Sequence, residues 1–197
     1  MSVGAVITAA GKSSRMGAFK PLLDIGGVSA AQRVVSVLHA AGAREIVVVT
    51  GNNAEELEDN LKHLGVVFLR NHMFEYNEMF DSVKIGLDRL KEKCGKICVT
   101  PVDVPLFTSE TVKALLKGSA GITIPRHNNQ TGHPVILDCS VVSEIMGYEG
   151  DGGLKGAISG LLHDTEYIDV SDSGILFDMD THDDYTAIVN MFLKRQD

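Results

Sequence analysis

A chain of 197 residues has the length of one domain rather than two, and its 44 % hydrophobic content and mean hydropathy of +0.08 exclude a largely disordered chain. Its net charge of −8 argues against a protein that binds nucleic acid or an anionic membrane through its overall charge. No apolar run reaches the roughly 18 residues of a membrane span. No Lys or Arg precedes Lys12, as it would in a signal peptide. We therefore expect one cytoplasmic domain over residues 1–197.

The first 117 residues alternate between strand and helix patterns. The apolar run over 3–9 predicts a buried strand, and 29–41 carries apolar residues at helical spacing before Gly42. The same alternation gives further strands at 44–50, 66–70 and 96–100, and helices at 53–63 (with an Asn cap), 77–92 and 108–117. This order predicts right-handed βαβ units in a mainly parallel sheet with helices on both faces. Functional residues are then expected at the carboxyl ends of the strands.

The second half is less regular but continues the same single α/β domain. Short strands are expected at 121–125, 134–138, 165–170 and 174–178, and helices at 140–147, 153–162 and 182–194. Asp183 and Asp184 are expected to stabilise the start of the last helix. The three cysteines, Cys94, Cys98 and Cys139, fit neither a disulfide framework nor a CxxC site, and we expect them to be buried and reduced.

Opposite charges gather in two segments of this acidic chain. The first 23 residues contain Lys12, Arg15 and Lys20 and no Asp or Glu, whereas residues 164–184 contain eight carboxylates and no Lys or Arg. The first segment could hold a phosphate and the second a divalent cation. The alternative is that both are solvated loops.

The cationic segment, TAAGKSSRMGAFKPLL, follows the first strand directly. Gly11 and Gly17 allow the backbone to turn and present N–H groups, and the three cations supply donors suited to a triphosphate. The spacing excludes a Walker A loop, because Val6 stands where its first glycine belongs, and it also excludes the GxGxxG dinucleotide fingerprint. A surface loop that uses glycine and serine only for its turns is the remaining alternative.

These residues resemble the AAGxSxRMGxxK loop of the MobA-like nucleotidyltransferases, and the AAG form is most similar to the molybdenum cofactor cytidylyltransferases. The resemblance implies a Rossmann-like nucleotidyltransferase fold in which the loop wraps a nucleoside triphosphate. It implies catalytic roles for Lys20, which would face the α-phosphate, and for Arg15. The nucleotide-binding positions that carry over are Ala9, Ala10, Gly11, Ser13, Arg15, Gly17 and Lys20.

Two acidic elements are candidate ligands of Mg²⁺. Asp103 lies just past an apolar strand, where a carboxylate would project toward a ligand, although it could instead serve as a turn or capping residue. Asp178 and Asp180, two residues apart, would point to one face of an extended segment. Their surroundings resemble the family's ADxPL and DIDTPEDY motifs, which implies that these carboxylates hold the metal; which of Asp178 and Asp180 does so stays open.

Weaker similarities concern the acceptor and the base. TGHPVIL and GDGGLK resemble elements beside the family's acceptor, which implies acceptor-binding roles for His133 and Lys155, although a structural or solvated His133 is an equal alternative. Ser82 is a further nucleotide-binding candidate. Its segment, EMFDSVKIGL, departs from the family's GMSSSLRAGL, because Phe80 and Asp81 replace two serines. These replacements put the choice of nucleotide in question.

The expected activity is transfer of the nucleotidyl group of an NTP, with CTP expected, to a phosphorylated acceptor with release of pyrophosphate and dependence on Mg²⁺. The resemblance implies molybdopterin as the acceptor and allows a molybdoenzyme partner. Two alternatives stay open: the same chemistry on a sugar or alditol phosphate, and a non-catalytic nucleotide-binding accessory protein for molybdoenzyme maturation.

Overall fold

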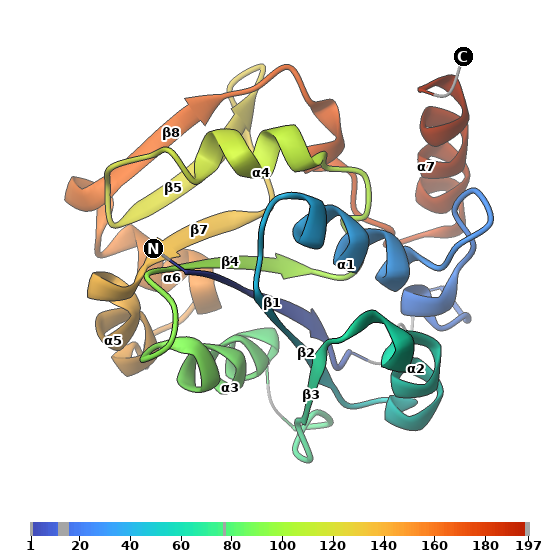
Figure 1. Ribbon diagram of the computed structural model, residues 1–197, viewed down its shortest axis with the longest axis horizontal. Helices are drawn as coiled ribbons and strands as arrows, with labels where there is room; N and C mark the ends of the chain where they lie inside the picture. The colour runs from blue at the N-terminus through green and yellow to red at the C-terminus, as the bar shows by residue number, and fades with distance from the viewer. Residues whose placement is uncertain (1, 12–15, 77, 196–197) are drawn as a thin grey trace.

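The computed structural model describes residues 2–11, 16–76 and 78–195, and these residues form an α/β fold around one eight-stranded sheet (Figure 1). The strand order is β3-β2-β1-β4-β7-β5-β6, and β8 pairs with β5. The strands are β1 (Val3–Ala9), β2 (Glu45–Thr50), β3 (Val67–Arg70), β4 (Lys96–Pro101), β5 (Ile122–His127), β6 (Gln130–Thr131), β7 (Val135–Asp138) and β8 (Thr165–Asp169). Strands β1 to β4 are parallel, whereas β7 runs antiparallel to β4 and β5.

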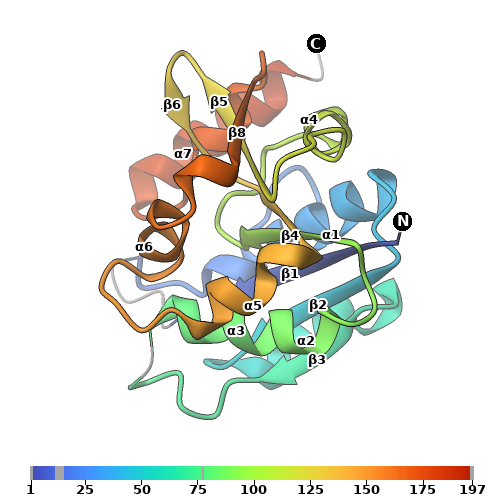
Figure 2. The same cartoon turned by 90° about the vertical axis from the view of Figure 1, so that its left-hand side faces the viewer.

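Helices cover both faces of the sheet, as the sequence predicts. One core packs side chains of α1 (Ala30–Ala40), α2 (Ala54–Leu61) and α4 (Ser109–Leu115), and the other packs those of α3 (Met79–Leu90), α5 (Cys139–Gly147) and α6 (Gly153–Ser159). Figure 2 shows α3 and α5 on the opposite side of β1 and β4 from α1 and α4. The last helix, α7 (His182–Lys194), contributes Ile188 to a third, smaller cluster with Ile25, Leu106 and Met179.

Strand β1 lies at the centre of this arrangement. Ala5 and Ile7 belong to the first core and Val6 to the second, which is the alternation expected of a strand buried on both faces. The chain leaves β1 toward β2 and β3 on one side and later returns to β4 on the other. The carboxyl ends of β1 and β4 therefore flank a topological switch point, where α/β proteins bind ligands.

Helix α3 packs closely against β1 because residue 86 is a glycine. A Cβ at Gly86 would overlap both methyl groups of Val6 on β1. The close approach brings Ser82, one turn earlier on α3, to the carboxyl end of the sheet.

Several local expectations from the sequence are wrong. Residues 174–178 do not form a strand: Ser173–Leu176 is a 3₁₀ turn, with Asp172 accepting a hydrogen bond from the Gly174 N–H. Asn53 makes no side-chain cap of α2, because its own backbone is left-handed (φ 48°). Cys139 is exposed, unlike Cys94 and Cys98.

Side chains cap the starts of several helices, and the role of Asp184 at the last one was expected from the sequence. Ser29 caps α1 in a reciprocal arrangement with Gln32. Thr108 caps α4. Asp184 accepts hydrogen bonds from the N–H and hydroxyl of Thr181, which completes a capping box at the start of α7. Within the described part of the chain, no helix has the length and apolar character needed to cross a membrane.

Candidate functional site

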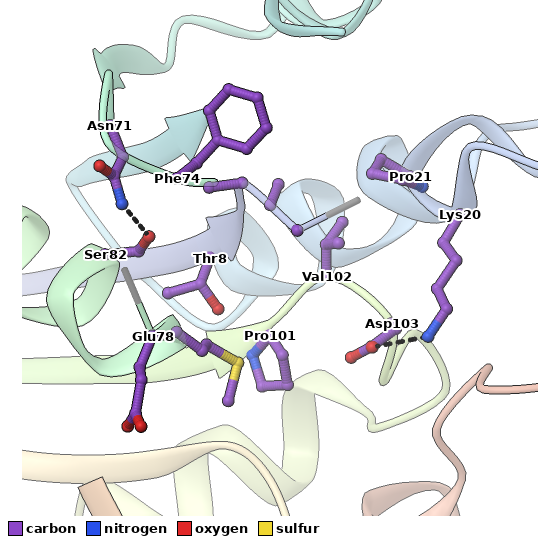
Figure 3. Close-up of a pocket in the computed structure, with 14 residues that line it drawn as sticks. Thr8, Lys20, Pro21, Asn71, Phe74, Glu78, Ser82, Pro101, Val102 and Asp103 are labelled. Carbon is purple, nitrogen blue, oxygen red and sulfur yellow. Dashed lines mark hydrogen bonds and ion pairs between the residues drawn. The ribbon is translucent and has the colours of Figure 1, made fainter. Parts of the chain in front are cut away.

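A cavity of about 160 Å³ opens at the carboxyl ends of the parallel strands (Figure 3). Residues that follow β1, β3 and β4 surround it, together with the start of α3 and Lys20. Its lining includes six residues proposed from the sequence as nucleotide-binding, catalytic or metal-binding positions: Ala9, Ala10, Gly11, Lys20, Ser82 and Asp103. The topology thus brings residues that are up to about 90 positions apart into one site.

The ammonium of Lys20 contacts two carboxylates that come from distant parts of the chain. Lys20 Nζ lies 2.7 Å from Asp180 Oδ1 and 3.4 Å from Asp103 Oδ2. Lys20 begins a 3₁₀ turn, Lys20–Leu22, and its side chain is only 12 % exposed. Sequence analysis singled out all three residues, and the fold gathers them at one point.

The electrostatic surroundings of Asp103 favour a cation beside it. Burial raises the pKa of the Asp103 carboxyl group, the charge and hydrogen bond of Lys20 oppose that rise, and the nearby charge of Asp178 adds to it. An ionised Asp103 in this position is therefore poorly solvated and depends on positive charge from its neighbours.

The segment around residue 179 is anchored to the loop that follows β4. The N–H of Met179 donates a hydrogen bond to the backbone carbonyl of Asp103 (3.0 Å), and the Met179 side chain is fully buried. Asp180 forms an ion pair with Lys20. Asp178 is exposed, and its charge contributes to the raised pKa of Asp103. Of the two alternatives for the second carboxylate, the geometry favours Asp180.

The donors at this point fit a metal that also binds a ligand's oxygens. Among the described residues, no cluster of three or more Asp, Glu, His or Cys side chains could hold a metal ion alone. Asp103 and Asp180 nevertheless share one cation already, the ammonium of Lys20. Mg²⁺ is commonly held by one or two carboxylates together with phosphate oxygens and water, so this pair suits a phosphate-bridged ion.

The glycine-rich loop leaves β1 along the wall of the cavity. Ala9 and Ala10 are buried there, and Gly17 has the left-handed backbone (φ 63°) that the turn requires. Ser13 and Arg15, also proposed from the sequence, lie outside the described residues. Gly51, just after β2, lets this wall close: a Cβ there would stand 2.9 Å from the Cβ of Ala10 and 2.8 Å from that of Phe74.

The cavity is also lined by residues that the sequence motifs did not identify, among them Thr8, Asn71 and Phe74. Asn71 directly follows β3, and its amide donates a hydrogen bond to the Ser82 hydroxyl (Nδ2 to Oγ, 3.1 Å). The rule that identified Asp103, a polar residue immediately after a buried parallel strand, applies equally to Asn71. Phe74 carries no such signal, since its place depends on the loop between β3 and α3.

A second, larger cavity of about 580 Å³ adjoins the first and shares Thr8, Glu78, Met79 and Pro101 with it. Its lining is largely apolar, with members from β4, β5, β7, α3 and α6. His133 and Lys155, the two acceptor-binding candidates, both line this cavity. The structure thus brings them together at a site that is contiguous with the carboxylates and the loop.

Burial lowers the pKa of His133 to about 4, so the imidazole is neutral near pH 7. Its Nδ1 is buried and has no hydrogen-bond partner among the described residues. A neutral His133 can offer a hydrogen bond to an acceptor but no positive charge, which leaves Lys155 as the cationic candidate in this cavity.

The two positions that depart from the family pattern do not line the first cavity. Phe80 faces the second cavity, where its ring meets the edge of Tyr148 and the ammonium of Lys84. The carboxylate of Asp81 accepts a hydrogen bond from the N–H of Glu78 at the start of α3. The substitutions therefore bear on the second cavity and on the helix start.

The family model described as "MobA-like NTP transferase domain" matches residues 5–165. The bifunctional protein GlmU of Staphylococcus haemolyticus is 33 % identical over 119 residues, covering 59 % of this chain and 26 % of GlmU. The chain thus spans about a quarter of such curated relatives. The molybdenum cofactor cytidylyltransferase of Escherichia coli K12 is 24 % identical over 187 residues, covering 93 % of this chain and 94 % of that protein.

Solved structures of similar fold cover nearly the whole chain. A nucleotidyl transferase from Methanothermobacter has a TM-score of 0.87 at 23 % identity and covers 98 % of this chain and 99 % of its own. The Mycobacterium tuberculosis protein Rv0371c, solved in complex with manganese, has a TM-score of 0.79 at 21 % identity (96 % and 98 % covered). CMP:2-keto-3-deoxy-manno-octonic acid synthetase, complexed with CTP, has a TM-score of 0.76 at 15 % identity (99 % and 100 % covered). The family match over most of the chain, together with the loop and carboxylates gathered at the switch point, shows that this chain belongs to the MobA-like NTP transferase domain family.

Proposed function

We propose that this protein transfers the cytidylyl group of CTP to the phosphate of an acceptor of the molybdopterin type and releases pyrophosphate. An oxygen of the acceptor phosphate attacks the α-phosphorus, and the bond between that phosphorus and the oxygen leading to the β-phosphate breaks. The acceptor phosphate is already an anionic nucleophile, so no Ser, Cys or His nucleophile is required. The protein's part is positioning and charge stabilisation.

The observation that carries the proposal is the placing of Lys20 between Asp103 and Asp180 at the mouth of the glycine-rich loop. A lysine held there by carboxylates can stabilise charge that develops on the α-phosphate and on the leaving pyrophosphate. Asp103 and Asp180 would hold Mg²⁺, which when bound neutralises phosphate charge and lines up the reacting groups. Arg15, expected from the resemblance to act with Lys20, stays a prediction, as does the cytoplasmic location.

The second cavity supports a ring-shaped acceptor over a polyol. Apolar side chains such as Phe80, Val135, Leu154 and Ile158 form much of its lining. The hydroxyl groups of a sugar or alditol would lose water there with few partners, and each unpaired group would cost about 1–3 kcal/mol. His133 and Lys155 would engage the acceptor's polar groups, and a molybdoenzyme that takes up the product is the expected protein partner.

The test is pyrophosphate release in the presence of Mg²⁺ with each of the four NTPs, first with molybdopterin and then with a sugar or alditol phosphate. We expect turnover with molybdopterin and a kcat/KM for CTP that exceeds that for GTP by about tenfold or more, since a site built around one hydrogen-bonding edge leaves polar groups unpaired with the wrong base. A preference for GTP would overturn the cytidylyl assignment. Binding of nucleotide without any pyrophosphate release would instead support an accessory role.

A further inference from the structure

The side-chain amide of Asn71 has a defined orientation in the wall of the first cavity. Asn71 is 3 % exposed, and its N–H donates to the carbonyl of Thr50. Its Oδ1 accepts a hydrogen bond from the N–H of Met73 (3.0 Å), so the other end of the amide, Nδ2, must be the donor to Ser82 Oγ. Figure 3 shows the Asn71 amide directed at the Ser82 hydroxyl.

This hydrogen bond leaves the proton of the Ser82 hydroxyl without a protein acceptor. Serines on helices often donate to the carbonyl four residues earlier, as Ser36 does to Gln32 and Ser159 does to Lys155 (2.8 Å each). Ser82 makes no such bond, and none of the described residues accepts its proton. The side chain is 2 % exposed and lines the cavity, so a ligand there is the natural acceptor.

We propose that Asn71 is a positioning residue that fixes the Ser82 hydroxyl as a hydrogen-bond donor toward the nucleobase. The inference rests on the proposed function. Cytosine presents two adjacent acceptors, O2 and N3, whereas guanine presents donors at N1 and N2 along the corresponding edge. A hydroxyl held as a donor therefore favours cytosine, and Asn71 contributes to base selection without touching the base.

The variant Asn71→Asp tests this polarity with almost no change in shape. A carboxylate can still accept the N–H of Met73, but toward Ser82 it can only accept, so the hydroxyl proton turns away from the cavity. We expect the ratio of kcat/KM for CTP to that for GTP to fall about tenfold, the equivalent of one hydrogen bond, mainly through a higher KM for CTP. A folded variant with an unchanged ratio overturns the inference.

Two controls separate positioning from general damage. In a Ser82→Ala background, Asn71→Asp should change the ratio no further, because the hydroxyl that it reorients is gone. Asn60→Asp is the matched control elsewhere, since Asn60 also pairs with a serine hydroxyl, that of Ser29, away from the cavity. It should leave the ratio unchanged.

The outcomes also distinguish this inference from the proposed function. If wild-type protein releases pyrophosphate but Asn71→Asp does not alter base preference, the reaction stands and the role of Asn71 is wrong. If no acceptor supports turnover, calorimetry gives the dissociation constants of CTP and GTP, and their ratio serves as the measure of base preference. Asn71→Asp should then weaken the preference for CTP about tenfold. Should Asn71→Asp fail to fold, Ser82→Ala alone must lower the CTP preference about tenfold, and an unchanged preference overturns the inference.

Discussion

At Lys20, a nearly buried ammonium is held by carboxylates from two other segments. In the proposed reaction, charge on the α-phosphate grows during nucleotidyl transfer, so a cation fixed beside it would stabilise the transition state more than the bound substrate. The Lys20 side chain is 12 % exposed, far less than the 70 % of Lys62, which forms a surface ion pair with Asp59.

Replacing Lys20 by Ala should therefore lower kcat by about 100-fold or more while changing the KM for CTP much less. Steady-state kinetics of pyrophosphate release measure both constants. Lys113→Ala is the matched control, since that lysine is about half exposed on α4 and pairs only with the neighbouring Glu110. Similar losses in the two variants would mean that the effect of Lys20→Ala does not come from its position beside Asp103 and Asp180.

Asp103→Asn should separate activity from stability. We expect a loss of at least about 100-fold in kcat, because the metal loses a charged ligand. Burial raises the pKa of Asp103, so the group favours the folded state when protonated, and this contribution falls as the pH rises through the raised pKa. At pH 7 the buried, ionised Asp103 therefore lowers the stability of the folded state. The thermal midpoint of Asp103→Asn at that pH should be no lower than that of the wild type.

Asp169→Asn provides the control for this variant, because Asp169 is exposed and pairs with Arg126. It should keep full turnover. A folded Asp103→Asn protein with near-normal turnover would remove Asp103 from the metal site.

His133 should make the folded state less stable in mild acid. Its pKa is lowered to about 4, against about 6.5 in an unfolded chain, so only the unfolded state takes up a proton between these values. Its contribution to stability is complete above pH 6.5 and is lost as the pH falls toward 4. Urea unfolding of His133→Gln across this range should show a shallower decline than the wild type, whereas exposed His63→Gln should show the same decline.

At the scale of elements, the contact between α3 and β1 depends on Gly86. Alanine normally stabilises a helix relative to glycine by about 1 kcal/mol, but here the added methyl group would meet the side chain of Val6. Gly86→Ala should therefore lower the free energy of unfolding by about 1–3 kcal/mol, as overpacking typically does. Because α3 also carries Ser82, the KM for CTP should rise.

Gly147→Ala is the matched control for the Gly86 variant. Gly147 ends α5, and a Cβ there would have no neighbour within 4 Å. Chemical denaturation should show a neutral or stabilising effect. Equal destabilisation at both positions would show that the packing of α3 on β1 is not the cause.

Sequence patterns identified most elements of this fold because their signals are local. The apolar run of β1, the helical spacing of apolar residues in α1 and the role of Asp184 at the start of α7 depend on only a few neighbouring residues. The prediction of a strand at 174–178 was wrong because Ile175 is buried by contacts with other segments while it lies in a 3₁₀ turn. An apolar run alone does not distinguish such a turn from a buried strand. The Asn53 prediction failed because the residue's backbone conformation decides whether its side chain can cap.

The site was predictable where a motif carried the information and not where packing did. Lys20, Asp103 and Asp180 each lie in a recognisable segment, but their meeting at one ammonium depends on the order of strands in the sheet. Phe74 and Gly51 shape the same cavity through contacts between loops that no spacing in the sequence records. The neutral state of His133 likewise follows only from its burial.

Across the whole molecule, the site joins the two ends of the chain. The loop after β1 supplies Lys20, and Asp180 stands just before α7. Helix α7 is held by Ile188, which is fully buried in the cluster that contains Met179, Ile25 and Leu106. Packing outside the first cavity therefore supports the position of Asp180.

Ile188→Ala should test that connection. Loss of this buried side chain should cost about 2–5 kcal/mol of unfolding free energy. Because α7 then holds Met179 and Asp180 less firmly, kcat should also fall at temperatures where the protein remains folded. Leu193→Ala, at a half-exposed position on the same helix, is the control and should affect neither property. Unchanged kcat in folded Ile188→Ala would show that α7 does not position Asp180.

The hydrogen bond between the Met179 N–H and the Asp103 carbonyl bears on how this family is delimited. The family model matches residues 5–165, yet the second carboxylate at Lys20 comes from residue 180. The segment that the family model matches therefore contains only one of these two carboxylates, Asp103. A recombinant hybrid that joined residues 1–165 to the C-terminal part of a relative would keep the whole stretch that the family model matches. We expect the hybrid to function only if the backbone of its C-terminal part donates a hydrogen bond to the Asp103 carbonyl, as Met179 does. The loop after β4 and the segment around residue 179 should therefore be inherited together.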